Sequence, residues 1–332
     1  MKALVYTAPN EVTYREEPEP RVQEGDVLIE VDAVGICGSD LHAYHGHDPR
    51  RVPPLILGHE LAGRILEGPG KGRRVTVNPL ITCGCCEYCI QGRNNLCANR
   101  TMIGMTRPGG FAERVTTAAA SVIDVPQDMD TRATALTEPA ATAVHALSIA
   151  GRALVRPLAE CRALVLGGGA IGMLAALLLS RSGVREVTVA ETNPLRRASV
   201  ANVSGAAVYD PREAGGPAAN SMDLVVDAVG GKATRDAAMS AVKPGGVVMH
   251  IGLQDGASEI DMRKLTLAEI TLIGTYTYTT ADMRATVRLL HEGAFGDLGW
   301  VEERPLSEGA RAFADLRDGL TAAAKIVLHP SC

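Results

Sequence analysis

Two short segments near the N-terminus combine residue types that bind metal ions. The first is Gly35-Ile36-Cys37-Gly38-Ser39-Asp40-Leu41-His42, and the second is Gly58-His59-Glu60-Leu61-Ala62-Gly63. Thiolate, imidazole and carboxylate groups bind zinc in proteins, and a set of three leaves one coordination position open for chemistry. Cys37, His59 and Glu60 are therefore candidate ligands of a catalytic zinc. Taken singly they would be a buried thiol, a turn histidine and a surface charge, so the prediction depends on their combination with other motifs.

A second set of candidate metal ligands lies in residues 83–97, which hold five of the eight cysteines. Four of them follow the spacing CxxCxxC and then, after seven further residues, C: Cys83, Cys86, Cys89 and Cys97. Four thiolates in one loop are typical of a structural zinc, which stabilises the loop and leaves no position for substrate. Cys85 falls outside this repeat. An iron–sulfur cluster or metal-free buried thiols are the alternatives, but nothing else in the sequence indicates electron transfer.

The segment Gly167-Gly168-Gly169-Ala170-Ile171-Gly172 matches the pattern GxGxxG and lies between a predicted strand and a predicted helix. In this pattern Gly167 makes the tight turn, Gly169 lets the backbone approach a pyrophosphate, and Gly172 allows the helix to pack closely on the strand. The N–H groups at the start of that helix favour phosphate binding, because they have no partner within the helix. The segment therefore predicts a dinucleotide site.

The cofactor preference is indicated by Glu191, which follows the next predicted strand. A carboxylate at this place accepts hydrogen bonds from the ribose hydroxyls and repels a 2′-phosphate, so the sequence predicts NAD in preference to NADP. Arg196 follows closely and is a further candidate contact of the cofactor, and Arg197 is next to it in sequence. These cations could weaken the preference, so its strictness stays open. A solvated glutamate at a strand end is the alternative interpretation.

The elements that must position these motifs fall into three regions. Residues 1 to about 140 are rich in short alternating runs, which predict short strands. From about 148 to 272 strands and helices alternate, which predicts a parallel, doubly wound sheet. The last sixty residues are mixed. The predicted strands are 163–166, 186–190, 223–227, 246–251 and 325–328. The predicted helices after the glycine-rich turn are one that ends at Ser180, one that begins near Pro194, and 232–242, 281–291 and 308–316.

Composition narrows the class of protein. The 332 residues are 46% hydrophobic and 21% charged, which is typical of a globular chain long enough for two domains. The net charge of −5 argues against a nucleic-acid partner, and pairs such as Arg50-Arg51 are interpreted as surface charge. The longest apolar run, residues 171–179, is too short to span a membrane. Because the N-terminus also lacks the pattern of a signal peptide, we expect a cytoplasmic protein.

The order of these motifs resembles the medium-chain zinc-dependent alcohol dehydrogenases over almost the whole chain. The matching features are the two N-terminal segments, the cysteine lobe, Gly109-Gly110-Phe111-Ala112-Glu113, the pair Glu138-Pro139 and the glycine-rich turn. Glu138 together with the candidate zinc ligands looks most like the branch that contains sorbitol, other polyol and threonine dehydrogenases. Two departures are the short stretch between Gly63 and Cys83 and the additional thiol of Cys85.

This resemblance implies an α/β fold with two domains. A GroES-like, β-rich catalytic domain would comprise residues 1–147 and 273–332, with the structural-zinc lobe at 83–97. A Rossmann domain, a doubly wound parallel sheet that binds NAD, would comprise residues 148–272. The resemblance further implies two zinc ions per chain, NAD as cofactor, and a homodimer or homotetramer without nucleic-acid or membrane partners.

The resemblance also implies roles for single residues. Cys37 and His59 would bind the catalytic zinc, and either Glu60 or Glu138 would complete the site directly or through water. Asp40 would orient His59 through its ring N–H. Ser39 and His42 would form a proton relay to solvent.

The expected activity is hydride transfer between NAD and a secondary alcohol, which would be a polyol, a sugar alcohol or an amino alcohol. A dehydrogenase of simple alcohols or aldehydes is the first alternative, and a non-catalytic zinc-binding protein of the same fold is the second. A zinc-free quinone or enoyl reductase would lack Cys37, His59 and the cysteine lobe. His45 and His47 either line the substrate entrance or lie in a surface loop, and the specific substrate stays open.

Overall fold

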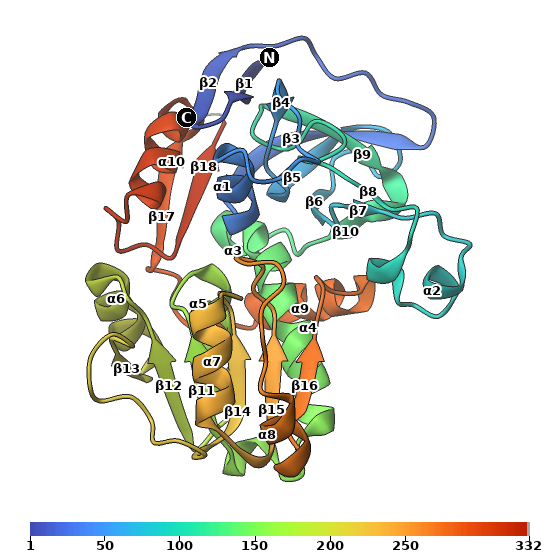
Figure 1. Cartoon of the computed structure of the whole chain (residues 1–332). Coiled ribbons are helices and arrows are strands. Elements are labelled where there is room, and N and C mark those ends of the chain that lie inside the picture. The colour runs from blue at the N-terminus through green and yellow to red at the C-terminus, as the bar shows by residue number, and fades with distance from the viewer. Residues whose placement is uncertain (331–332) are drawn as a thin grey trace.

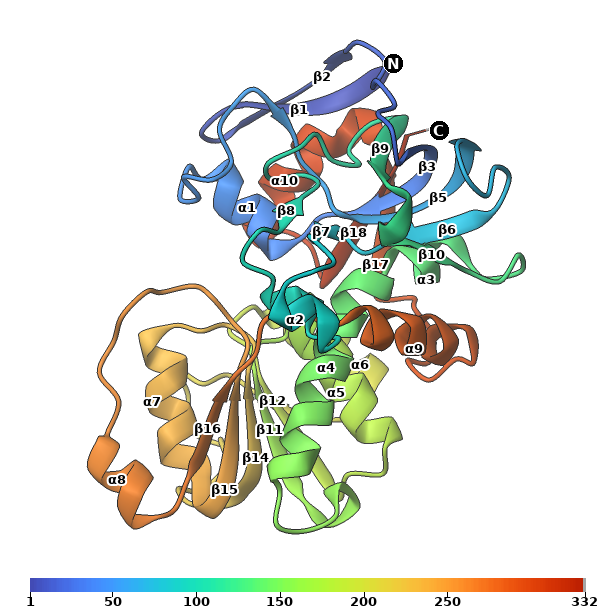
Figure 2. The same ribbon diagram turned by 90° about the vertical axis from the view of Figure 1, so that its right-hand side faces the viewer.

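The computed structural model describes residues 1–330 and consists of two parts, drawn one above the other in Figure 1. The upper part, here called the β-rich half, contains both ends of the chain, which lie close together in Figures 1 and 2. Its strands are β1 (Lys2–Ala8), β2 (Glu11–Glu16), β3 (Asp26–Gly35), β4 (Leu55–Ile56), β5 (Glu60–Glu67), β6 (Arg74–Val77), β7 (Leu80–Ile81), β8 (Thr101–Met102), β9 (Arg114–Ala118), β10 (Val122–Asp124), β17 (Val301–Pro305) and β18 (Lys325–His329).

The main sheet of the β-rich half has the strand order β10-β6-β5-β3-β18-β17, and β9 also pairs with β3. The C-terminal strand β18 runs antiparallel to β3, with Val327 opposite Gly35. Short helices lie around this sheet: α1 (Gly38–Tyr44), α2 (Glu87–Ile90), α3 (Thr131–Ala135) and α10 (Gly309–Arg317). Residues from the two ends of the sequence therefore meet beside the segment that holds Cys37.

The lower part, here called the parallel-sheet half, is built on six parallel strands in the order β13-β12-β11-β14-β15-β16. Figure 2 shows α4, α5 and α6 on one face of this sheet and α7 and α8 on the other. Its elements are α4 (Thr137–Ala153), β11 (Arg162–Leu166), α5 (Ala170–Arg181), β12 (Glu186–Ala190), α6 (Pro194–Ser204), β13 (Ala207–Tyr209), β14 (Met222–Asp227), α7 (Lys232–Ala241), β15 (Val242–His250), α8 (Met262–Leu267), β16 (Thr271–Gly274) and α9 (Thr280–His291).

The central strands of this sheet are apolar on both faces because helices cover both sides. Leu164 and Val165 of β11 point in opposite directions, and both are almost completely buried. The same holds for Leu224 and Val225 of β14. The predicted parallel, doubly wound sheet is confirmed.

The predicted helix over 232–242 ends one residue earlier, at Ala241, because Val242 already pairs with Met222 as the first residue of β15. The register of β14 and β15 shifts after that pair, where Pro244 and Gly245 interrupt regular pairing. The sequence indicated a strand only from residue 246. It also gave no separate signal for the short edge strands β13 and β16.

One helix, α4, connects the two halves. It begins beside the candidate zinc site with Thr137 and Glu138 in its first turn, and it ends at Ala153 just before the parallel sheet. The predicted domain boundary between residues 147 and 148 lies within this helix. Among the helices of residues 1–330, none is both long enough and apolar enough to cross a membrane.

Candidate active site and zinc-binding lobe

Cys37 lies at the start of α1 because the segment from Gly35 to His42 ends strand β3 and begins this helix. The Cys37 thiol accepts a hydrogen bond from the backbone N–H of Ser39 at 3.5 Å. Asp40, three residues on, accepts the backbone N–H of Cys37 through Oδ2 at 3.0 Å, which completes a capping box. The local structure therefore fixes the position of the Cys37 sulfur at the start of α1.

Asp40 also faces His59. Its Oδ1 lies 3.5 Å from Nδ1 of the His59 ring, and both side chains are buried. Burial lowers the pKa of His59, but the charges of Asp40 and Cys37 outweigh burial, and the pKa is raised well above its usual value. The surroundings of this ring therefore favour a positive charge, and one carboxylate orients two of the predicted ligands.

Glu60 is the first residue of β5 and lies opposite Gly35 of β3. A side chain at Gly35 would place its Cβ 2.1 Å from Oε2 of Glu60, so the glycine makes room for the carboxylate. Lys325 of β18 donates to both oxygens of Glu60, at 2.7 and 2.6 Å, and to the backbone oxygen of Ile36 at 2.7 Å. Both charged side chains are fully buried, so each needs the other.

Glu138, in the first turn of α4, is buried beside Tyr278 of the loop between β16 and α9. The Tyr278 hydroxyl donates to Oε1 of Glu138 at 2.5 Å. Burial raises the pKa of Glu138 to about 7; His59 opposes this rise, Glu60 adds to it, and Tyr278 opposes it. Burial and the charge of Glu138 raise the pKa of Tyr278 well above its usual value, so its hydroxyl stays protonated and donates.

Ser39 and His42 lie one turn apart on α1 and so face the same side. The Ser39 hydroxyl accepts a hydrogen bond from Arg51 at 3.1 Å, while His42 is exposed, with its ring centroid 5.3 Å from that of His47. The structure records no direct hydrogen bond between Ser39 and His42. Their role as a proton relay stays a prediction.

The three predicted catalytic ligands fit a zinc ion. One ligand atom each of Cys37, His59 and Glu60 lies within 4.8 Å of the others; His59 and Glu60 are buried and Cys37 is half-buried. Thiolate, imidazole and carboxylate are ligands that zinc accepts. Glu138 is outside this group and contacts Tyr278, whereas Glu60 is inside it but is held by Lys325. Both carboxylates therefore remain candidates for the direct ligand.

The second predicted metal site lies in the lobe that contains α2 and the 3₁₀ turn η1 (Asn94–Leu96). The sulfurs of Cys86 and Cys89 are 3.5 Å apart, those of Cys83 and Cys97 are 3.6 Å apart, and those of Cys83 and Cys89 are 3.9 Å apart. A tetrahedral zinc with Zn–S bonds of about 2.3 Å separates its sulfurs by about 3.8 Å. Cys85 is not in the group.

The titration of these thiols also fits a cation. Backbone N–H groups of Cys85 and Cys86 lower the pKa of Cys83 to about 6. For Cys86, the backbone N–H of Cys89 favours ionisation, but burial and the neighbouring thiols raise the pKa to about 11. Four thiolates in this space repel one another, and a bound divalent cation removes that repulsion.

The glycine-rich turn connects β11 to α5 at the carboxyl edge of the parallel sheet. Gly167 has φ +96°, and a Cβ at Gly172 would lie 1.8 Å from the Gly167 oxygen, so both positions require glycine. A Cβ at Gly169 would meet nothing within 4 Å. That open space lies at the start of α5, beside the N–H groups of Ala170 and Ile171, where the sequence predicted a pyrophosphate.

Glu191 lies directly after β12 and contacts this turn. Its Oε2 accepts the backbone N–H of Gly168 at 2.8 Å, and its Oε1 accepts that of Asn193 at 2.7 Å. The Arg196 side chain lies 3.4 Å from Oε2. The structure therefore brings Glu191 and Arg196 together beside the predicted phosphate site, and their contacts with a ribose stay a prediction.

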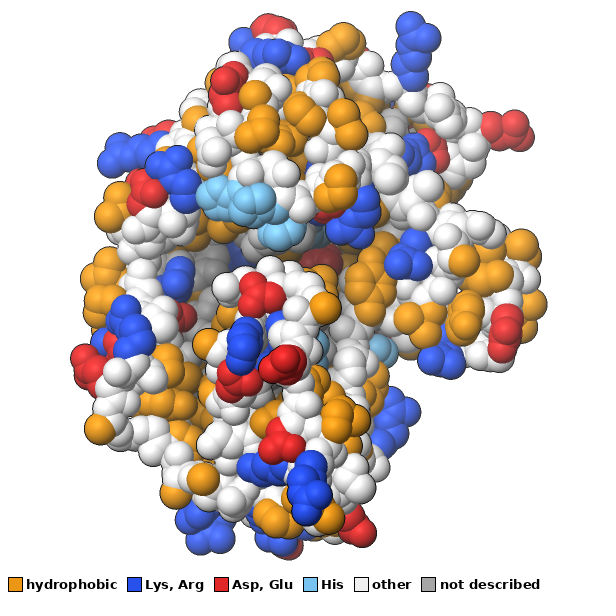
Figure 3. All heavy atoms as spheres, viewed as in Figure 1, with side chains coloured by type: hydrophobic (Ala, Val, Ile, Leu, Met, Phe, Trp, Pro, Cys, Tyr) orange, Lys and Arg blue, Asp and Glu red, His pale blue; other side chains and the backbone are white. Residues whose placement is uncertain are grey.

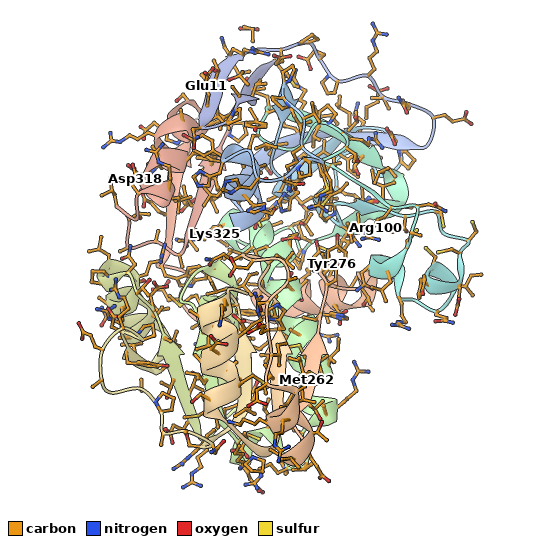
Figure 4. The ribbon with its side chains drawn as sticks, viewed as in Figure 1. Glu11, Arg100, Met262, Tyr276, Asp318 and Lys325 are labelled. Atoms are coloured by element: carbon orange, nitrogen blue, oxygen red, sulfur yellow. The ribbon has the colours of Figure 1, made fainter. Side chains whose placement is uncertain are left out.

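Three contacts of the candidate site were not predicted. Lys325 was assigned only to a closing strand, Tyr278 carried no signal, and Arg51 was interpreted as surface charge. The last interpretation is wrong, because Arg51 is buried and binds Asp48, Ser39 and the backbone oxygen of Gly104. An Arg next to an Asp–Pro turn gives no sequence signal of burial. Figure 4 shows Lys325 near the level at which the two halves meet.

Comparison with known proteins is consistent with this geometry. Residues 23–127 match the family described as "Alcohol dehydrogenase GroES-like domain", and residues 170–292 match "Zinc-binding dehydrogenase". L-galactonate-5-dehydrogenase of Escherichia coli (strain K12) is 32% identical over 311 residues, 88% of each chain. L-threonine 3-dehydrogenase of Chelativorans sp. (strain BNC1) is 30% identical over 99% of this chain and 98% of that protein.

A solved structure, acetophenone reductase from Geotrichum candidum NBRC 4597 in complex with NAD, superposes with a TM-score of 0.87 at 27% identity, and covers 99% of this chain and 96% of that one. The expected combination of a GroES-like domain and a Rossmann domain is confirmed, as are the predictions of an oxidoreductase, of zinc and of a nicotinamide cofactor. The chain belongs to the zinc-dependent alcohol dehydrogenase family.

Proposed function

We propose that the protein transfers hydride between NAD and a secondary hydroxyl of a polyol, sugar alcohol or amino alcohol. The observation that carries the proposal is the group of Cys37, His59 and Glu60, with the buried Glu138 on the helix that leads into the cofactor-binding half. Cys37 and His59 would hold a zinc ion there, and Glu60 and Glu138 would offer it two carboxylates, either of which could give way to a substrate oxygen or amine. Such a site suits a substrate that offers two neighbouring donor atoms.

The chain's own residues have distinct parts in this proposal. When bound, zinc supplies a Lewis acid that polarises the substrate hydroxyl, and NAD supplies the hydride acceptor. Cys37 and His59 hold the metal, and Asp40 fixes the orientation of His59. Ser39 takes the hydroxyl proton and His42, which is exposed, passes it toward solvent. Gly169, with the start of α5, and Glu191 hold the cofactor.

The names of two relatives support the substrate class. One relative is an L-galactonate-5-dehydrogenase and the other an L-threonine 3-dehydrogenase. L-galactonate is a polyol with a carboxylate, and L-threonine has a hydroxyl next to an amine-bearing carbon. Both substrates carry a second donor atom beside the reacting hydroxyl, which suits a site that would offer zinc the two carboxylates of Glu60 and Glu138.

Simple alcohols are the second candidate class, and a matched substrate panel separates the two. A vicinal diol and its monohydric analogue of equal carbon number are compared by NADH absorbance at saturating NAD. We expect a higher kcat/KM for the diol, and Glu138→Gln should lower diol turnover more than it lowers NAD affinity. A clear preference for the monohydric alcohol would remove the polyol assignment and leave the family assignment unchanged.

We also propose that residues 1–147 and 273–332 act as the catalytic domain and 148–272 as the cofactor domain.

We further propose that the chain forms a homodimer or homotetramer in the cytoplasm. Strand β16 is at the edge of the parallel sheet, and exposed apolar side chains lie on and beside it: Leu253, Met262, Leu267 and Leu272. An open strand edge with apolar neighbours is typical of an interface. The cysteine site requires reduced thiols, as in the cytoplasm. Light scattering after gel filtration should give two or four chains, and Leu272→Lys should give one.

A further inference from the structure

Three histidines lie at the end of α1 and in the turn that follows it: His42, His45 and His47. Gly46 has φ +76°, a left-handed conformation that turns the chain back toward the helix. The backbone N–H of His47 donates to the carbonyl oxygen of His42 at 3.0 Å, and that of His45 donates to the carbonyl oxygen of Leu41 at 3.0 Å. The turn therefore gathers three imidazole groups, of which the proposed reaction uses only the first.

The spacing of these rings matches that of imidazoles on one metal ion. The ring centroids of His42 and His47 are 5.3 Å apart, and those of His45 and His47 are 5.7 Å apart. Two imidazoles on one tetrahedral zinc, with Zn–N bonds of about 2.0–2.1 Å, have ring centroids about 5.2 Å apart. The trio is not among the groups of residues 1–330 whose ligand atoms already lie within 4.8 Å of one another. Its rings must therefore turn to bind an ion, and His42 and His47 can do so because they are exposed.

Asn10 holds His45 in the form that a metal ion needs. Nδ1 of His45 lies 3.0 Å from Oδ1 of Asn10. Because an amide oxygen only accepts hydrogen bonds, Nδ1 carries the proton and Nε2 keeps a lone pair. The backbone N–H of Asn10 donates to the carbonyl oxygen of Tyr44 at 2.6 Å, which fixes Asn10 beside α1. Metal-binding histidines typically donate their other ring N–H to such an acceptor, which fixes the tautomer and the orientation of the ring.

The charges around His45 also favour its neutral form. Burial lowers the pKa of His45, and the positive charges of His47, Arg317 and His42 lower it further. Neutral imidazole is the form that binds a metal ion. Arg317 would repel a bound cation, but its guanidinium forms two hydrogen bonds of 2.7 Å with the carboxylate of Asp318, which offsets much of its charge.

We propose that His42, His45 and His47 form a third metal site, which binds a divalent transition-metal ion such as Zn²⁺ and thereby inhibits the enzyme. Imidazole nitrogen suits zinc, copper and nickel ions. The site has no thiolate ligand, so it should bind zinc more weakly than the two sites described above and fill only when Zn²⁺ is added.

The inhibition rests on the proposed function, in which His42 passes the substrate proton toward solvent. A metal ion on His42 takes the lone pair that would accept this proton. Figure 3 shows histidine side chains gathered over α1, at the hollow between the two halves. Zinc bound there should therefore slow proton release while Cys37 and His59 keep their own ion.

Equilibrium dialysis of the zinc-loaded enzyme against free Zn²⁺ counts the bound ions. We expect three zinc ions per chain in the wild type and two in His47→Gln at the same concentration of free Zn²⁺. The affinity of the third site should fall by at least about tenfold in His47→Gln, because loss of even an indirect partner of a ligand has that effect. Asn10→Asp should instead raise this affinity by about tenfold, since a carboxylate makes His45 a stronger base.

His291→Gln is the matched control, because His291 is an exposed histidine at the end of α9, outside the trio. It should keep three zinc ions with unchanged affinity. NADH formation is then measured with increasing free Zn²⁺, and each rate is expressed relative to that variant's own rate without added Zn²⁺. Half-inhibition should need at least about tenfold more Zn²⁺ in His47→Gln than in the wild type or in His291→Gln.

Contrary results for this site and for the proposed function are distinguishable. A wild type that holds only two zinc ions at about 0.1 mM free Zn²⁺, which fills a site with a Kd of about 1 μM, would show that the inference is wrong. A third zinc that His47→Gln retains with unchanged affinity would also show this, and both results leave the proposed function standing. A third zinc that His47→Gln loses, but that does not slow the wild type, would refute the inhibition. If the zinc-loaded wild type forms no NADH from any substrate, the proposed function fails, and the zinc count still decides whether the third site exists.

Discussion

Lys325 donates hydrogen bonds to both carboxylate oxygens of Glu60, at 2.7 and 2.6 Å, and neither side chain is exposed to solvent. The two residues are 265 positions apart in sequence and meet because β18 pairs with β3 next to Cys37. The pair decides how the site uses its carboxylates. Lys325 engages both oxygens of Glu60, whereas Tyr278 engages only Oε1 of Glu138. The second oxygen of Glu138 is therefore the carboxylate oxygen left for a ligand.

Replacing Lys325 should destabilise the protein and change the zinc site. Lys325→Met leaves a buried carboxylate without its cation, which costs about 3–5 kcal/mol of unfolding free energy. Adding Glu60→Gln should recover a large part of that loss, because the uncompensated charge disappears. Urea denaturation of the single and double variants measures the effect. Equal stability of Lys325→Met and the wild type would show that the ion pair is not formed.

The Tyr278 hydroxyl should control the pH at which Glu138 ionises. Burial raises the pKa of Glu138 to about 7, and the hydrogen bond from Tyr278 opposes this rise. Tyr278→Phe removes the donor, so the pKa should rise further and the acidic limb of the kcat/KM profile should move to higher pH. Tyr209→Phe, in β13, is the control and should leave the profile in place. An unchanged acidic limb in Tyr278→Phe would show that Glu138 is not the group whose ionisation limits activity at low pH.

In the glycine-rich turn, Gly172 should be required for folding and Gly169 for the binding of NAD. An alanine at Gly172 meets the Gly167 oxygen at 1.8 Å, so Gly172→Ala should cost about 1–3 kcal/mol of stability or more. Gly169→Ala meets nothing within 4 Å, so it should melt like the wild type but bind NAD at least about tenfold more weakly. Calorimetry of melting and of NAD titration tests both. Normal NAD binding by Gly169→Ala would show that the pyrophosphate of NAD does not bind in this space.

Glu191 should determine the preference for NAD. Glu191→Ala removes the acceptor for the ribose hydroxyls and leaves Arg196 unpaired, so the efficiency with NAD should fall by about 10- to 100-fold while that with NADP rises relative to it. Glu186→Ala is the control, because Glu186 is exposed at the start of the same strand and pairs with Arg162. Equal efficiency of the wild type with both cofactors would overturn the role of Glu191.

The parts of the site that could be predicted are those whose signal is local in sequence. The cysteine lobe lies within 83–97, and the glycine-rich turn lies between one strand and one helix, so spacing alone indicates their chemistry. The order of the parallel-sheet elements followed from alternating strand and helix patterns. Edge strands such as β13 have three residues and too little periodicity to stand out.

The parts that could not be predicted depend on contacts between distant segments. The partner of Glu138 is 140 residues away in Tyr278, and a lysine in a strand pattern does not reveal that it is buried against Glu60. Arg51 was misassigned for the same reason, since its burial depends on Gly104 and Asp48. Charged residues become identifiable as buried only when the fold shows what surrounds them.

The central claim is that Cys37 holds a catalytic zinc at which an alcohol is oxidised by NAD, separate from the zinc of the lobe. Zinc content and NADH formation are measured on the same samples of wild type, Cys37→Ser and Cys86→Ser, with a polyol substrate. We predict two zinc ions per chain and turnover in the wild type, and one zinc ion, no turnover and a nearly unchanged melting temperature in Cys37→Ser. Cys86→Ser should instead lose the lobe zinc and melt at a lower temperature. A Cys37→Ser variant that keeps both zinc ions and normal NADH formation would contradict the account.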